Sequence, residues 1–165
     1  MNKTLHYSII LLRLIVSLLF FYTLYNNEPL TKNIEHNTAI VTFLLDNETS
    51  ITFHCELAIT AQQQQQGLMN RSFLPHNQGM LFLIDPPRNV TFWMKDTLIP
   101  LDIIFIDETK KIINIESAEV EQNVPVFNLT RYYIHLPATY VVEINYGLSK
   151  FFGIENGTET TIEYL

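Results

Sequence analysis

The sequence predicts a mainly β domain, an antiparallel β-sandwich or a partly closed barrel with one or two short helices, preceded by an N-terminal transmembrane helix. Three observations predict this fold class. The segment from Tyr7 to Tyr25 is almost entirely apolar. After it, short runs of β-branched and aromatic residues alternate with turn-forming residues, a spacing typical of sandwiches and barrels. The 165-residue chain leaves 140 residues after residue 25, enough for one modest core.

The apolar front segment is long enough to cross a membrane. Leu5 to Tyr25 spans 21 residues, about 30 Å as an α-helix, which matches the hydrocarbon core of a bilayer. Arg13 lies near its N-terminal end, where a long side chain can extend its charge toward the interface. Lys3 precedes the segment and Glu28 is the first charged residue after it. The positive-inside rule therefore predicts a cytoplasmic N-terminus and a body outside the cytoplasm.

The predicted organisation has three parts. Residues 1–25 form a signal-anchor or transmembrane segment, residues 26–37 a polar tether, and residues 38–165 an extracytoplasmic β-rich domain. A cleaved signal peptide with a secreted body is the alternative, although residues 19–37 contain no Ala, Gly or Ser at which cleavage would be expected. The first predicted partner is thus the membrane, through the N-terminal helix.

Six Asn-x-Ser/Thr sequons, five of them in the body, also favour an exported location. The alternative is that a composition rich in Asn and Thr produces them without selection. If the sites are used, they lie on the surface, because a glycan is bulky and solvated. The glycosylation candidates in the body are Asn47, Asn70, Asn89, Asn128 and Asn156.

The first elements of the body follow from local sequence. Residues 39–45 and 51–59 are rich in β-branched and aromatic side chains and flank Asp-Asn-Glu-Thr, which predicts a hairpin. Thr60 can cap a short helix through the glutamine run at 62–66, which Gly67 or the following turn ends. The glutamine run is interpreted as a solvated helix face.

The later elements are predicted in the same way. Residues 120–136 are expected to form a long loop in which function can lie. A second hairpin is expected where two strands flank Asp-Glu-Thr-Lys. The predicted strands are residues 80–84, 90–95, 102–106, 111–117, 139–144 and 158–164, with one or two helical turns at residues 148–152.

Three sequence blocks carry a family resemblance. They read GLMNRSFLPHNQGMLFLI, FWMKDTLIPLDIIFID and YVVEINYGLSKFFGIENGT, in that order. In these blocks the chain resembles the small bacterial and archaeal family called domain of unknown function 192, over about residues 38–165. The resemblance implies a compact β-rich fold, often behind a signal or anchor, with no established activity. Gln66 stands where the family usually has Arg, and Asp96 where it usually has Asn, so a ligand contact at either position would differ here.

Composition excludes several function classes. Lys3 and Arg13 lie in the front segment, so the body has eight basic and 17 acidic residues and a formal charge of −9. This charge disfavours nucleic-acid binding, which needs a basic surface. One cysteine excludes an intrachain disulfide framework and a Cys-rich zinc site. No nucleophile elbow, phosphate loop, dinucleotide fingerprint or HExxH motif is present, so we expect no cofactor, and a non-catalytic protein is favoured.

The densest polar cluster surrounds the turn Leu-Ile-Pro-Leu at residues 98–101. It is interpreted as a pocket for a small polar or glycan-like ligand, with Asp102 and Arg71 fixing the ligand and Trp93 stacking on it. A structural role for Asp102, as an acceptor for backbone N–H groups of the turn, is the alternative. The predicted ligand-binding residues are Arg71, Trp93, Lys95, Asp96, Thr97 and Asp102.

Two further functions stay open. Asp96 and Asp102 could serve acid–base hydrolysis of envelope material if burial raised the pKa of one carboxyl group. The thioethers of Met69, Met80 and Met94 could hold monovalent copper in an accessory protein, against the simpler interpretation that they fill gaps in a core. The main hypothesis is a non-catalytic binding or accessory module for a small ligand or a cell-surface partner.

Three other residues carry groups that can take part in chemistry, namely His54, Cys55 and Glu143. His54 and Cys55 are neighbours on one predicted strand, so their side chains point to opposite faces, and Cys55 is interpreted as a buried free thiol. Glu143 alternates with apolar neighbours and could face either a pocket or solvent. Its direction decides whether it has a role in a site.

Overall fold

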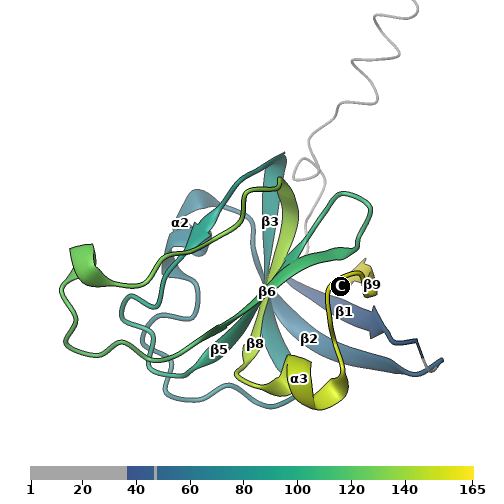
Figure 1. The fold of residues 1–165 in the computed structure, drawn as a ribbon, viewed down its shortest axis with the longest axis horizontal. Coiled ribbons are helices and arrows are strands. Elements are labelled where there is room, and N and C mark those ends of the chain that lie inside the picture. The colour runs from purple at the N-terminus through teal and green to yellow at the C-terminus, as the bar shows by residue number, and fades with distance from the viewer. Residues whose placement is uncertain (1–36, 47) are drawn as a thin grey trace, which may run out of the picture. The chain divides into compact units, whose positions relative to one another are not determined.

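The computed structural model describes residues 37–46 and 48–165 (Figure 1). In this part of the chain, seven strands form one sheet in the order β6-β5-β8-β3-β2-β1-β9. These strands are β1 (Thr38–Leu44), β2 (Ser50–Ala58), β3 (Gln78–Arg88), β5 (Leu101–Ile106), β6 (Ile112–Ala118), β8 (Ala138–Asn145) and β9 (Glu159–Tyr164). The remaining elements are a ribbon of β4 (Thr91–Phe92) and β7 (Tyr132–Tyr133), the helices α2 (Ala61–Gln66) and α3 (Leu148–Phe152), and the 3₁₀ turn η2 (Val126–Asn128).

The predicted mainly β class with two short helices is confirmed for the described residues, and one strand pair differs from the prediction. All pairs in the sheet are antiparallel except β2–β3, which is parallel. Parallel neighbours need a crossover connection, and the 19 residues between β2 and β3 (59–77), which include α2, provide it. The sequence therefore folds into one curled mixed sheet rather than two stacked antiparallel sheets.

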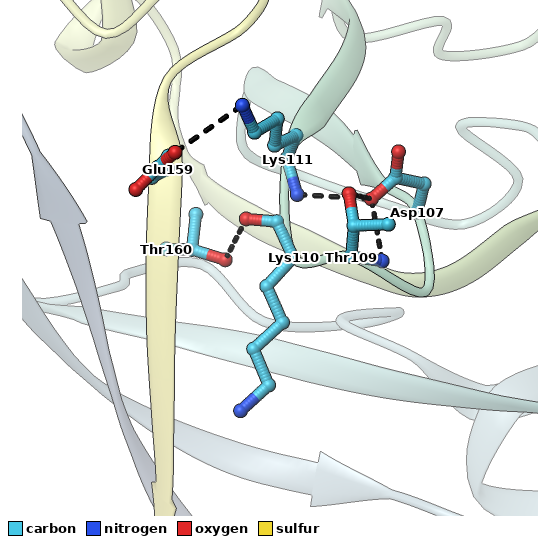
Figure 2. A network of polar contacts seen from close by, with 6 residues as sticks. All are labelled: Asp107, Thr109, Lys110, Lys111, Glu159 and Thr160. Carbon is cyan, nitrogen blue, oxygen red and sulfur yellow. Dashed lines mark hydrogen bonds and ion pairs between the residues drawn. The ribbon is translucent and has the colours of Figure 1, made fainter.

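The sheet curls until its two edge strands meet at one end, which is the partly closed barrel among the two predicted alternatives. Lys111, next to β6, forms an isolated antiparallel bridge with Glu159 of β9, and their side chains pair at 3.2 Å. The backbone N–H and the hydroxyl of Thr160 both donate to the carbonyl oxygen of Lys110, at 2.8 and 2.9 Å (Figure 2). Asp107 Oδ1 organises the turn by accepting two backbone N–H groups.

The sheet is buried on both faces, so its central strands are apolar along most of their length. Side chains of one face form the first core, which includes Phe43, Phe53 and Ile104, and α3 packs on it through Phe152. Side chains of the other face form the second core, which includes Phe82 and Phe105 among others. Because side chains alternate along a strand, each central strand contributes to both cores.

The ribbon of β4 and β7 covers part of the second core. Phe92 of β4 makes edge-on ring contacts with Phe82 at 5.0 Å and with Phe105 at 5.8 Å. The predicted long loop at 120–136 therefore holds η2 and β7, and β7 ties it to the sheet face through β4. These contacts leave a hollow between the ribbon and α2.

No helix in the described ranges is long and apolar enough to cross a membrane. The predicted anchor at 1–25, the tether except its last residue, and the sequon at Asn47 lie outside the described residues. The other four sequon asparagines are exposed, and their glycosylation stays a prediction; they are Asn70, Asn89, Asn128 and Asn156.

Candidate functional site

A pocket of about 300 Å³ opens on the second-core face, between α2 and the segment that contains β4. Its wall combines polar side chains of α2 with aromatic side chains of β3 and of the β4 segment, and Glu143 of β8 lies within it. Pockets that bind small molecules are typically apolar and aromatic, with a few polar groups placed to orient the ligand. The residues that line the pocket include Gln64, Met69, Phe82, Phe92, Trp93, Thr97 and Glu143.

Glu143 is the acidic residue in the pocket wall. In the sequence Val-Val-Glu-Ile of β8, the alternation of faces puts Val142 on the first core and Glu143 on the second. Its neighbours across the sheet are apolar, Met80 on β3 and Ile103 on β5. The side chain is therefore enclosed by hydrocarbon and is only 6% exposed.

The carboxyl group of Glu143 has no hydrogen-bond or ion-pair partner among the described residues. Burial without a compensating partner disfavours the charged form and raises the pKa of Glu143 to about 8. At neutral pH the group is therefore mostly a neutral carboxylic acid, which offers one O–H donor and acceptor lone pairs to the pocket. A strongly shifted pKa inside a cleft is a recognised mark of functional sites.

Trp93 forms part of the pocket wall and is half-buried. The guanidinium carbon of Arg131 lies 4.4 Å from the centre of its ring, a cation–π contact. Arg131 is in turn held by the carbonyl oxygens of Val126 and Leu129, at 3.0 and 3.3 Å. The loop at 120–136 thus fixes the indole through Arg131.

The glutamine run of α2 is not uniformly solvated. Gln64 is half-buried, and its Nε2 donates to the carbonyl oxygens of Ala58, Ile59 and Leu83, the last at 2.7 Å. The other glutamines of the run are exposed. Five identical residues give no sequence signal for which one turns inward; the helical phase, which Thr60 sets as the capping-box residue, decides it.

The fold divides the predicted ligand-binding residues. Trp93 and Thr97 line the Glu143 pocket. Lys95, Asp96 and Thr97 line a second hollow next to the loop at 120–136, and the Lys95 and Asp96 side chains pair at 3.7 Å on an exposed surface. Thr97 is the residue that the two hollows share.

Arg71 is engaged within the chain. Both of its terminal nitrogens donate to the carboxylate oxygens of Glu56, a bidentate ion pair that is partly exposed. This hydrogen bonding lowers the pKa of Glu56 and raises the pKa of Arg71. The guanidinium therefore already has a carboxylate partner and is not among the residues that line the pocket.

Asp102 faces the first core, on the opposite side of the sheet from Glu143. It is fully buried, and its Oδ1 accepts from the hydroxyl of Ser117 at 2.8 Å. Its Oδ2 accepts from the hydroxyl and from the backbone N–H of Ser149, the latter at 2.9 Å. Asp102 thus joins β6 to the first turn of α3, and the structure does not bring it together with Trp93.

The remaining candidates are mostly core residues. Met80 and Met94 are buried in the second core, whereas Met69 lines the pocket. Cys55 is a buried free cysteine, and burial raises the pKa of its thiol to about 12. Among the described residues, no His, Cys, Asp and Glu side chains gather in a group of three that could hold a metal ion.

The three sequence blocks of the family resemblance meet at the pocket. The first block contributes Met69 and Phe82, the second Trp93 and Thr97, and the third Glu143. A family model matches residues 43–162, and its family is DUF192, described as "Uncharacterized ACR". The chain belongs to this family. The predicted resemblance is thereby confirmed, and DUF192 membership extends over most of the described residues.

Two solved structures share the DUF192 fold of this chain. A protein from Sinorhizobium meliloti 1021, whose description proposes a transcription regulator, is 29% identical, with a TM-score of 0.69, over 78% of this chain and 96% of its own. A protein of unknown function from Novosphingobium aromaticivorans DSM 12444 is 34% identical, with a TM-score of 0.66, over 81% of this chain and 92% of its own. No curated protein matches the sequence.

Proposed function

We propose that this DUF192 chain is a non-catalytic binding module, and that its ligand site is the pocket that contains Glu143 and Trp93. One observation carries the proposal: a buried carboxyl group without a partner in the described structure lies in the wall of an open pocket. Burying a polar group without a hydrogen bond costs about 1–3 kcal/mol by mutational data. A ligand that supplies the missing partner offsets this cost.

The composition of the pocket favours binding over hydrolysis. Glycoside hydrolysis needs two carboxyl groups within about 10 Å of each other around the scissile bond. Of the residues that line the pocket in the described structure, Glu143 alone carries a carboxyl group. Asp102 belongs to the opposite core, and Asp96 lies exposed in a surface turn. The geometry therefore gives neither aspartate a part in this pocket.

Two other functions receive less support. The burial of Met80 and Met94 in an apolar cluster favours gap filling over a copper site. The solved structure from Sinorhizobium meliloti is described in terms of transcription regulation. For this chain, however, a formal charge of −9 on the body opposes binding to the phosphates of DNA.

The proposed setting is outside the cytoplasm, with the domain tethered to the membrane by residues 1–25. The exposed sequon at Asn89 bears on this proposal, because Asn89 also lines the pocket. A glycan on Asn89 would stand at the pocket wall and restrict the size of the ligand.

Trp93 provides a direct test, because it is the only tryptophan in the chain. Its fluorescence would be followed while the full-length chain is titrated with benzylammonium, benzyl alcohol, benzoate and N-acetylglucosamine. We expect at least one probe to give a saturable change with one-to-one stoichiometry. Thr91→Phe, which adds bulk at an exposed position of the pocket wall, should weaken that probe at least about tenfold.

The matched control is Thr161→Phe, which adds the same bulk at an exposed position of β9, away from the residues that line the pocket. It should leave the titration unchanged. A flat fluorescence signal with all four probes at millimolar concentration would overturn the proposed function. Equal weakening by both phenylalanine variants would do so as well, because the binding would then not depend on this pocket.

A further inference from the structure

We propose that the Glu143 pocket recognises an organic cation with N–H donors, a primary ammonium or a guanidinium group. This inference rests on the proposed function and names the class of ligand that the site takes. It follows from which hydrogen-bonding atoms of the pocket wall are already used and which remain.

Gln64 has used its donors. Its Nε2 is directed to three carbonyl oxygens, those of Ala58, Ile59 and Leu83. A carbonyl oxygen accepts only from a donor, so these partners settle which end of the amide is nitrogen. No described residue donates to Gln64 Oε1. What Gln64 can still offer a ligand is therefore an acceptor oxygen.

Thr97 has also used its donor. It is buried, and its hydroxyl donates to the carbonyl oxygen of Lys95 at 3.2 Å. The lone pairs of the Thr97 oxygen remain. The side chains of Gln64 and Thr97, together with the carboxyl group of Glu143, therefore present oxygen acceptors to the pocket. A ligand rich in N–H donors complements these acceptors, whereas an anion would find no free donor on Gln64 or Thr97.

The aromatic part of the wall also suits a cation. The rings of Phe82, Phe92 and Trp93 line the pocket, and the negative face of an aromatic ring attracts an ammonium or a guanidinium group within about 6 Å. The chain itself shows this interaction, because Arg131 already lies over Trp93 at 4.4 Å. The charge of −9 on the body favours the approach of cations as well.

The charged residues near Glu143 do not neutralise its carboxyl group, so a cationic ligand can pair with it. On the same sheet face, Glu56 lies beyond Met80 on β2 and is neutralised by Arg71, while Glu116 lies beyond Ile103 on β6. In the pocket wall, the cationic residue of the described structure is Arg88, which is exposed and donates weakly to the carbonyl oxygen of Pro86 at 3.4 Å.

Binding of the cation is coupled to loss of a proton. The O–H bond of the Glu143 carboxylic acid breaks, the proton leaves to the buffer, and the resulting carboxylate pairs with the ligand. Because burial raises the pKa of Glu143 to about 8, nearly one proton is released per ligand at pH 7. The affinity for a cation therefore rises with pH up to about 8 and then levels off.

Calorimetry on the full-length chain tests the ligand class. At pH 7, benzylammonium, benzyl alcohol and benzoate would be titrated in two buffers that differ in their enthalpy of ionisation, which reports the protons exchanged on binding. We expect benzylammonium to bind at least about tenfold more tightly than the other two. It should release close to one proton, and its affinity should rise between pH 6 and pH 8.

Glu143→Gln keeps the size of the side chain and removes the charge. It should weaken the affinity for benzylammonium at least about tenfold and abolish the proton release. The affinity for benzyl alcohol should stay within about twofold of the wild-type value. The matched control is Glu56→Gln, which removes a carboxylate from the same sheet face without touching the pocket wall. It should leave all three affinities unchanged.

The outcomes separate this inference from the proposed function. If benzyl alcohol or benzoate bound as tightly as benzylammonium, the inference that the ligand is a cation would be wrong. The proposed function as a binding module would still hold. Benzylammonium binding without proton release, or with equal loss in both glutamine variants, would also overturn the inference of a cation. Failure of every probe to bind would overturn the proposed function and this inference together.

Discussion

Asp102 and Glu143 are buried carboxyl groups on neighbouring strands, β5 and β8, and they differ in what surrounds them. Ile103 pairs with Glu143 across the two strands, and Asp102 pairs with Ile144, so the two acids are one register step apart. Asp102 points into the first core and accepts three hydrogen bonds, from Ser117 and twice from Ser149. Glu143 points into the second core and has no partner in the described structure.

The difference separates an acid with a structural role from an acid that we propose binds a ligand. Asp102 holds together elements that are distant in sequence, so its partners come from the fold. Glu143 lies in the wall of a pocket, so its partner must come from outside. Burial alone therefore does not mark a functional residue; the proposal for Glu143 rests on its burial, its raised pKa and its place in the wall of a pocket together.

Removing Asp102 should have the largest effect on stability. Asp102→Ala leaves the backbone N–H and hydroxyl of buried Ser149, and the hydroxyl of exposed Ser117, without their acceptor. We expect it to lower the free energy of unfolding by about 3–5 kcal/mol. Urea unfolding at pH 7 measures this loss. Asp102→Asn, which keeps one acceptor oxygen, should lose less. A loss below about 1 kcal/mol for the alanine variant would mean that these hydrogen bonds do not stabilise the fold.

Replacing Glu143 with a residue that cannot ionise should raise the free energy of unfolding, whereas removing Asp102 lowers it. The pKa is raised from about 4.5 to about 8 in the folded chain, so between these pH values the folded state binds more protons than the unfolded state. The stability of the wild type therefore falls as pH rises through this window. Glu143→Gln removes this dependence, and we expect it to be about 4 kcal/mol more stable than the wild type at pH 8.

At pH 5 the stability difference between the Glu143→Gln variant and the wild type should fall to about 1 kcal/mol, because Glu143 is then protonated in the folded state and only partly ionised in the unfolded state. Urea unfolding at pH 5 and pH 8 makes the comparison. A constant difference between the two proteins at both pH values would contradict the assignment of the pH dependence to Glu143.

A third buried polar group, the hydroxyl of Thr139, extends the comparison of Asp102 and Glu143, with a smaller expected effect on stability. The hydroxyl of Thr139, also on β8, is buried and has no hydrogen-bond partner in the described structure. Thr139→Val keeps the shape and removes this cost, so we expect a gain of about 1 kcal/mol in the free energy of unfolding. Thr160→Val is the matched control, because the Thr160 hydroxyl is bonded to the carbonyl oxygen of Lys110. It should lose stability; a loss in both variants would show that both hydroxyls are satisfied.

Most strands could be predicted from the local sequence, because a strand that is buried in a sheet is a short run of apolar, β-branched and aromatic residues. The hairpins at the Asp-Asn-Glu-Thr and Asp-Glu-Thr-Lys turns are present as β1–β2 and β5–β6. The parallel β2–β3 pair could not be predicted, because the pairing partner of a strand depends on where a crossover returns. Curling of the sheet, with the contact of Lys111 and Glu159, also joins residues distant in sequence.

The candidate site was predictable only in part. Trp93 and Thr97 were expected to contact a ligand, and both line the pocket. The apolar neighbours of Glu143 in the sequence indicate a strand, but the face of the sheet on which its side chain lies depends on the register of β8 against β3 and β5. A shift by one residue moves every side chain of a strand to the other face. Gln64 was hidden among identical neighbours.

The sequence by itself determined the mainly β character, the family and the acidic charge, because each depends on composition or on runs of neighbouring residues. Tertiary structure alone decided which buried acid has partners. Asp102 meets Ser117 and Ser149 because β6 and α3 arrive beside it, 15 and 47 residues later in the chain. Glu143 meets Met80 and Ile103 because the neighbouring strands place apolar side chains there. Hydrogen bonding and desolvation act through space, so a carboxyl group acquires its role only when the strands pair.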